Sequence, residues 1–313
     1  MDILHNLQWV LPLRSAAATQ LAFGLSWLGY STFIMFFLVL GYWTWSKSIF
    51  YRLLVLVAIN ALLNAFVKDL VQDPRPLLAL RLDDLVGQSY GLPSGHAQLA
   101  VVMWLWLAWE LRRRWAWVLA SCIAVAVMFS RLYLGVHDLE DVLAGAVLGG
   151  GSLLVFERLR HQPWVWQCPL GWHMAWITAI TALALALWPN GAPPTYIGLV
   201  AAWLLAATWA RAWEPVHIGY MPPRALPRKI VLGLLGTAGF VLEQKLLQVV
   251  GTLLPLVQLS ALPALLWPAV QGLCNGLFVA LLMPWLFVRL RLAGAVPGAS
   301  APHPSKRPRA VAA

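Results

Sequence analysis

The feature that most constrains this chain is a succession of apolar segments, each long enough to cross a lipid bilayer. About 20 consecutive apolar residues span the hydrocarbon core as a helix. We therefore predict an all-α fold, a polytopic membrane bundle of about nine transmembrane helices. The predicted spans are Phe23–Trp45, Tyr51–Leu70, Ser94–Glu110, Trp115–Leu134, Leu139–Phe156, Gly171–Trp188, Ile197–Trp213, Ile230–Val250 and Val270–Val288.

The composition excludes a soluble globular fold. Charged residues make up 11% of the 313 residues and the mean hydropathy is +0.73, whereas soluble domains carry about 25% charged residues. So few charges cannot cover a surface that faces water. Cys122, Cys168 and Cys274 are too few and too scattered for a disulfide framework or a zinc site, and we predict no metal and no cofactor.

The apolar pattern divides the chain into four predicted parts. Leu253–Trp267 is also apolar, but Pro255 and Pro263 interrupt it and Pro268 follows it, so we interpret it as a re-entrant or interfacial hairpin. The four parts are an interfacial N-terminal segment (1–22), a catalytic transmembrane core (23–160), additional transmembrane helices (161–293) and a disordered basic tail (294–313).

The basic residues predict the orientation of the bundle. With the N-terminus outside and the nine segments alternating, sixteen Lys and Arg residues fall on the inner side and six on the outer side. Cytoplasmic loops carry an excess of Lys and Arg, so this orientation is favoured. The net charge of +10 is thereby explained by membrane topology, and no nucleic-acid partner is predicted.

Three of the six outer cations lie in turns that this topology brings to the same membrane face. They are Lys68 at the end of the second helix, Arg75 after it and Arg131 at the end of the fourth helix. The third helix begins on that face with Ser94 and Gly95 after a proline. A guanidinium fork fits phosphate oxygens, and the free N–H groups of a helix N-terminus bind anions. The turns therefore predict a site for a tetrahedral anion.

Two histidines on the same face predict phosphoryl transfer. His137 and Asp141 are four residues apart, so on one helix face the carboxylate can hold one ring nitrogen and leave the other as a nucleophile. His96 would protonate the leaving oxygen. We expect Ser94 to cap its helix as well as to contact phosphate. The outer loop with Arg81, Asp83 and Asp84 is expected to be solvated.

The ordered set of motifs resembles the signature of the type 2 phosphatidic acid phosphatase (PAP2) superfamily. The pattern is Lys-x6-Arg-Pro, then Pro-Ser-Gly-His, then Ser-Arg-x5-His-x3-Asp, over roughly residues 50–156. The resemblance implies that His137 is the nucleophile, Asp141 its partner and His96 the acid. It also implies that Lys68, Arg75, Ser94, Gly95 and Arg131 hold phosphate. The matching residues are Lys68, Arg75, Pro76, Pro93, Ser94, Gly95, His96, Ser130, Arg131, His137 and Asp141.

The helix layout favours one branch of that superfamily. One membrane helix precedes the Lys68 helix and about four follow the core, which resembles the sphingosine-1-phosphate phosphatase and glucose-6-phosphatase branch. This implies a membrane phosphatase that acts through a phosphohistidine on a phosphorylated lipid, such as an isoprenyl pyrophosphate, a phosphatidate-like lipid or a sphingoid phosphate. We expect a bacterial inner membrane, with the site facing the periplasm and the C-terminus in the cytoplasm.

Three other interpretations stay open. A lipid phosphotransferase would pass the phosphoryl group to another lipid, and a glucose-6-phosphatase-like enzyme would take a soluble ester. A transporter would carry the phosphatase-like site only as an accessory. The sequence also leaves open whether the protein forms a homo-oligomer.

Overall fold

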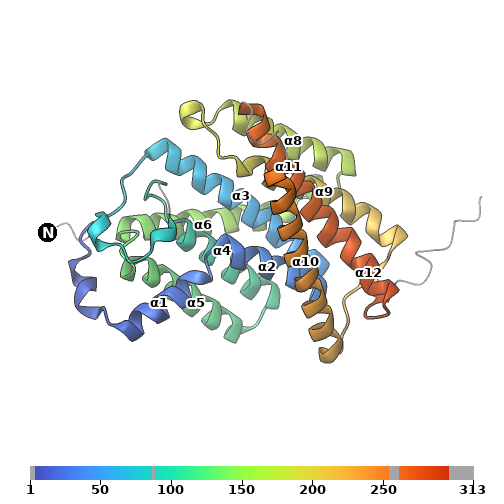
Figure 1. The fold of residues 1–313 in the computed structure, drawn as a ribbon, viewed down its shortest axis with the longest axis horizontal. Helices are drawn as coiled ribbons and strands as arrows, with labels where there is room; N and C mark the ends of the chain where they lie inside the picture. The colour runs from blue at the N-terminus through green and yellow to red at the C-terminus, as the bar shows by residue number, and fades with distance from the viewer. Residues whose placement is uncertain (1–3, 87–88, 254–260, 296–313) are drawn as a thin grey trace, which may run out of the picture.

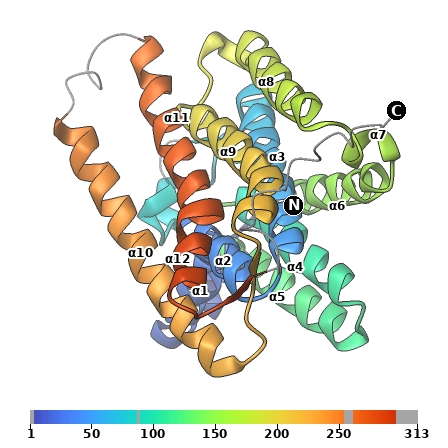
Figure 2. The same ribbon diagram turned by 90° about the vertical axis from the view of Figure 1, so that its right-hand side faces the viewer.

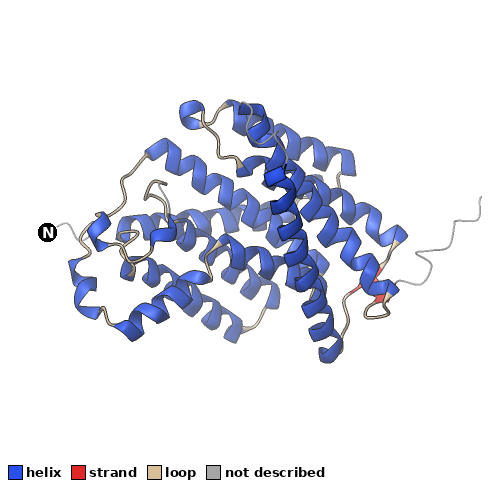
Figure 3. Ribbon diagram, in the orientation of Figure 1, coloured by secondary structure: helices blue, strands red, loops and turns tan. Residues whose placement is uncertain are grey.

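The computed structural model describes residues 4–86, 89–253 and 261–295. Helices dominate it, and among these residues the only strands are two short ones that pair antiparallel (Figure 3). The all-α prediction is therefore confirmed. The predicted hairpin over Leu253–Trp267 falls partly, and the predicted tail almost wholly, outside the described residues.

The helices form two groups that follow one another along the chain (Figure 1). In the first group, α4 packs against α3, α5 and α6, and α1 lies against α5. Its members are α1 (Ala16–Trp27), α2 (Ser31–Thr44), α3 (Lys47–Val71), α4 (Gly95–Leu111), α5 (Arg114–Tyr133) and α6 (Leu139–Arg160), with short turns η1 (Gln8–Leu13), η2 (Leu78–Leu80) and η3 (Asp84–Val86).

In the second group α9 packs along α11, and α10 reaches back to α2 (Figure 2). The last long helix is continuous through a π-helical turn, η6. The members are α7 (Pro163–Trp166), α8 (Leu170–Ala186), α9 (Tyr196–His217), α10 (Leu226–Leu253), α11 (Ala261–Leu277), η6 (Phe278–Leu282) and α12 (Met283–Arg289), with η4 (Pro189–Gly191), β1 (Tyr220–Met221) and β2 (Gly294–Ala295).

Five described helices are long and apolar enough to cross a membrane, and the pair α1–α2 gives a sixth if it is one span. Both α4 and α8 have 17 residues, slightly fewer than a typical span requires. The protein is thus a multi-pass membrane protein, and the count of nine stays a prediction. The expected single helix Phe23–Trp45 is wrong: α1 and α2 meet at a bend of 52°.

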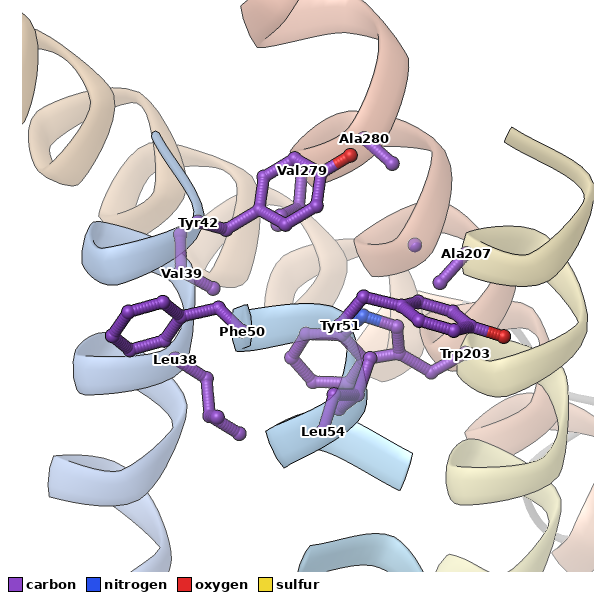
Figure 4. Close-up of a pocket in the computed structure, with 11 residues that line it drawn as sticks. Leu38, Val39, Tyr42, Phe50, Tyr51, Leu54, Trp203, Ala207, Val279 and Ala280 are labelled. Carbon is purple, nitrogen blue, oxygen red and sulfur yellow. The ribbon is translucent and has the colours of Figure 1, made fainter. Parts of the chain in front are cut away.

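An apolar pocket lies where the two groups meet (Figure 4). It lies between α2, α3, α9 and η6, and its walls include Tyr42, Tyr51 and Trp203. Tyr51 is near the start of α3, whereas Lys68 is in its last turn, about 25 Å away at 1.5 Å per residue. None of the predicted site residues lines this pocket, so the predicted chemistry lies elsewhere.

Candidate active site

The three predicted turns meet at one end of the first group of helices. The backbone N–H of Ser94 donates to the carbonyl of Asp141 over 2.8 Å, and that of Gly91 donates to the carbonyl of Asp73 over 2.8 Å. The chain from α3 to α4, on the left in Figure 1, is thereby tied to the turn between α5 and α6. The predicted convergence on a single end is found in the structure.

His137 and Asp141 are held together by the start of α6. Asp138 caps this helix in a reciprocal capping box with Asp141, an arrangement that satisfies free N–H groups at a helix start. Oδ2 of Asp141 lies 2.8 Å from Nδ1 of His137, and both side chains are buried. Helix capping therefore fixes the carboxylate beside the imidazole.

The second ring nitrogen of His137 faces a cation. Nη1 of Arg75 lies 3.0 Å from Nε2 of His137 and 2.9 Å from the carbonyl of Val136. Because a guanidinium only donates hydrogen bonds, Nε2 must present its lone pair, and the proton sits on Nδ1 toward Asp141. This is the tautomer that a nucleophilic Nε2 requires.

The surroundings keep His137 neutral. Burial first, and then the charges of Arg75 and Lys68, hold the pKa of His137 well below its usual value of 6.5. Burial and the charge of Arg131 lower the pKa of Arg75 to about 10, so this guanidinium stays charged at neutral pH. Cations crowded in this way are stabilised by an anion between them.

Arg131 is completely buried at the end of α5. Its Nη1 donates to Ser26 and, over 3.1 Å, to Oδ2 of Asp83. Its Nε and Nη2 are buried and have no hydrogen-bond partner among the residues that the structure describes. Nε and Nη2 are the two donors on one edge of the guanidinium, the edge that binds phosphate in a bidentate way.

Lys68 serves the loop before α4. Its Nζ donates to the carbonyls of Tyr90 and Gly91, the latter over 2.8 Å. The ammonium group has three donors, and the bonds to Tyr90 and Gly91 use two of them to fix the loop that leads to Ser94. Lys68 therefore holds the loop and also supplies positive charge.

The start of α4 presents unsatisfied polar groups. Ser94 occupies the capping position, but its side chain makes no capping bond, so the expected cap is wrong. Within the described part of the chain, Oγ of Ser94, Nε2 of His96 and Oδ1 of Asp141 are buried without a hydrogen-bond partner. A Cβ on Gly95 would lie 3.1 Å from Oδ1 of Asn64, so a larger residue would crowd this helix start.

Such atoms are costly in a protein interior unless a ligand satisfies them. Several of them lie in the three motifs, together with the free edge of Arg131. A phosphate group offers acceptor oxygens for Ser94 and Arg131. The arrangement can therefore hold a phosphoryl group next to two imidazoles. No group of three His, Cys, Asp or Glu side chains in the described ranges could hold a metal ion.

Several residues that the sequence motifs do not include complete the site. Asp83 is 2% exposed and bonds Arg131, so the expectation that it is a solvated loop residue is wrong. Ser89 accepts a bond from Nη2 of Arg75 through Oγ, over 2.8 Å. Asn64 donates to the carbonyl of Pro93 over 3.1 Å and to Gln98 over 2.9 Å. A polar residue in an otherwise apolar helix was the available signal for Asn64 and Gln98.

Comparison with known proteins places these residues in a family. Residues 49–164 match the model of the PAP2 superfamily. Phosphatidylglycerophosphatase B of Bacillus subtilis is 31% identical over 161 residues, which cover 47% of this chain and 76% of that protein. Sphingosine-1-phosphate phosphatase 1 of Rattus norvegicus is 27% identical over 137 residues, 41% of this chain and 31% of that protein. The chain thus spans about a third of the latter's length.

One solved structure is also similar. It is the crystal structure of a transmembrane PAP2 type phosphatidylglycerolphosphate phosphatase from Bacillus subtilis, with 25% sequence identity and a TM-score of 0.44. The similarity covers 49% of this chain and 82% of that one. Neither α1 nor α2 lies within the residues that the family model matches.

Proposed function

The chain belongs to the PAP2 superfamily, and from this premise we propose that it is an integral membrane phosphatase that hydrolyses the phosphate or pyrophosphate ester of a lipid. The observations that carry the proposal are the free edge of Arg131 and the bonded His137–Asp141 pair, which the turn closed by the Val136 N–H to Arg131 carbonyl bond connects. The relatives are named for phosphatidylglycerophosphate and sphingosine-1-phosphate, and these names support a lipid phosphate as the substrate class.

The proposed reaction has two steps. Nε2 of His137 attacks phosphorus while Nε2 of His96 gives its proton to the leaving oxygen, so that an N–P bond forms and the ester P–O bond breaks. In the second step His96 takes a proton from water, the water oxygen attacks phosphorus, and the N–P bond breaks to release phosphate. Asp141 holds the Nδ1 proton of His137 throughout.

The cations stabilise the charge of the transferring group. Arg131 offers its free edge, Arg75 lies on the attacking nitrogen, and Lys68 adds positive charge. Ser94 and the N–H groups at the start of α4 complete the proposed phosphate cradle, with Gly95 leaving room for the ligand. For phosphate to meet Nε2 of His137, Nη1 of Arg75 must turn from that nitrogen to a phosphate oxygen.

We propose that this end of the bundle faces the periplasm of a bacterial inner membrane and that the C-terminus is cytoplasmic. The distribution of basic residues supports it, since Lys47, Arg52 and Arg160 lie at the opposite ends of the same helices. The catalytic core of 23–160 and the additional helices of 161–293 correspond in this proposal to the two groups of helices.

The proposal is tested with purified protein and a panel of lipid and soluble phosphates. We expect phosphate release from a lipid phosphate that survives a chelator and disappears in His137→Ala. A folded protein that releases no phosphate from any ester, or a His137→Ala variant as active as the original, would contradict it. Labelled phosphate that appears on a second lipid instead of in water would identify a phosphotransferase.

A further inference from the structure

The bend between α1 and α2 lies against the proposed active site. Ser26 is in the last turn of α1, and Gly29 and Tyr30 form the break before α2 begins. The polypeptide reaches the site here from outside the residues that the family model matches. Ser26 contacts Arg131 here, and Gly29 and Tyr30 contact His96.

Among the residues that the structure describes, Arg131 forms its side-chain hydrogen bonds through Nη1, and its guanidinium also lies over the Tyr30 ring. Nη1 donates both to Oγ of Ser26 and to Oδ2 of Asp83, and the Arg131 and Asp83 side chains are 0% and 1% exposed. Because both bonds fall on Nη1, the edge formed by Nε and Nη2 stays available. Ser26 and Asp83 therefore orient the guanidinium without occupying the edge that would hold phosphate.

Tyr30 links this pair to His96. Its hydroxyl donates to the same oxygen of Asp83 that Arg131 contacts. Its ring meets the His96 ring edge to face, with the ring centroids 4.7 Å apart and an interplanar angle of 89°. The hydroxyl thus bonds the carboxylate that holds Arg131, whereas the ring contacts the imidazole and also lies 5.9 Å from the guanidinium carbon of Arg131.

Gly29 packs against Cδ2 and Cγ of the His96 ring. A Cβ at this position would lie 2.4 Å from Cδ2 of His96, which is closer than atoms can approach without displacement. The break between α1 and α2 therefore lets the backbone of Gly29, which has no side chain, pack against the imidazole. Gly24, five residues earlier on the chain, has open space around the position of a Cβ.

We propose that Ser26, Gly29, Tyr30 and Asp83 are positioning residues of the phosphatase, because they aim the free edge of Arg131 and the Nε2 atom of His96 at one phosphoryl group. This inference rests on the proposed function. It assigns the broken first span a task in the reaction, and it assigns two separable tasks to the two parts of Tyr30.

The first test separates the hydroxyl of Tyr30 from its ring. Tyr30→Phe removes the bond to Asp83 and keeps the ring, so we expect KM for the lipid phosphate to rise about tenfold while kcat changes little. The inhibition constant of orthovanadate, a phosphate mimic, is expected to rise with it. Asp83→Asn and Ser26→Ala should act in the same direction.

The second test uses two amphiphilic monoesters, one with an alkyl and one with an aryl leaving group. The alkyl oxygen needs a proton from His96 as it leaves, and the aryl oxygen needs it much less. We expect Tyr30→Leu and Gly29→Ala to lower kcat for the alkyl ester at least about tenfold more than for the aryl ester. Tyr30→Phe should restore the ratio of the two rates, and Gly24→Ala should keep both rates.

Distinct outcomes overturn the inference and the function beneath it. If the original protein hydrolyses neither ester and His137→Ala behaves identically, both fall. If the original protein is active, but the variants lower both esters equally and leave vanadate inhibition unchanged, only the positioning roles fall. Thermal unfolding of each variant is measured alongside the kinetics. A shift in the ratio of the alkyl-ester rate to the aryl-ester rate in a stably folded variant supports the inference. Loss of folded protein lowers both rates equally and cannot change their ratio.

Discussion

The two ends of the α3–α6 bundle use their basic residues in different ways. At the end where α3 begins, Lys47 is bonded to Glu214 over 2.6 Å, and Arg52 and Arg160 share Glu110 over 3.1 and 3.0 Å. At the other end, Arg131 keeps one edge of its guanidinium unbonded, and the nearest group to Nε2 of His137 is another cation, Arg75.

The difference shows which cations are structural and which await a ligand. Arg52 and Arg131 are both paired with a carboxylate, but among the described residues Arg52 leaves only Nε without a partner, whereas Arg131 leaves both Nε and Nη2. A buried guanidinium edge without a partner raises the energy of the empty protein, and an anionic ligand removes that cost. The same residue type thus stabilises the fold at one end and prepares binding at the other.

The largest expected effect is the loss of the nucleophile. His137→Ala should lower the rate of phosphate release by on the order of 10⁴-fold or more, because the covalent path is removed. The measurement is phosphate release by purified protein in detergent. A residual rate within tenfold of the original would mean that another group attacks phosphorus.

A substitution at each end distinguishes the two kinds of cation. Arg131→Lys keeps the charge but removes the bidentate edge, so kcat/KM should fall about 10²-fold. Arg52→Lys at the opposite end should leave kcat/KM within about twofold. Equal losses in the two variants would erase the proposed distinction.

The pH profile should respond to Arg75. The lowered pKa of His137 keeps this side chain neutral below its usual value of 6.5, so the acid limb of kcat/KM should lie below that pH. Removing one cation raises the pKa, so Arg75→Gln should move the limb to higher pH as well as lower the activity. Arg52→Gln serves as the control, and an acid limb at the same pH in Arg75→Gln would count against the assignment.

The smallest expected effect concerns stability. Glu110→Gln leaves Arg52 without a carboxylate and Arg160 with Glu157 alone, so the free energy of unfolding should fall by about 1–3 kcal/mol with the activity of the folded protein retained. Glu140 is the control residue, because its side chain is 45% exposed and pairs with His5. Glu140→Gln should change the free energy of unfolding by less than about 1 kcal/mol. Equal changes would show that burial does not set the strength of these pairs.

Local spacing was enough to predict much of the site. His137 and Asp141 are four residues apart, so one helix start sets their contact, and apolar segments of about 20 residues predict helices whatever surrounds them. The ends of α3, α5 and α6 accordingly fall within a few residues of the predicted ones. The alternating membrane topology alone predicts that the three turns lie at one end of the bundle.

Contacts between distant segments were beyond the reach of such patterns. Asp83 and Arg131 are 48 residues apart, and nothing in a short loop with three charges distinguishes a buried carboxylate from a solvated one. The break at Gly29 has no proline, so the mean hydropathy of Phe23–Trp45 predicts one continuous helix. In the structure the break places Gly29 against His96, a contact between segments that hydropathy does not reveal.

The central claim is that Nε2 of His137 attacks phosphorus, and trapping the intermediate tests it most directly. Purified protein is mixed with a lipid phosphate that carries a radiolabelled phosphoryl group, quenched in alkali within one turnover, and digested for peptide mapping. We expect radiolabel on His137 that is stable in alkali and lost in acid, and we expect no labelled peptide in His137→Ala. Label on Ser94, or label that persists in His137→Ala, would contradict it.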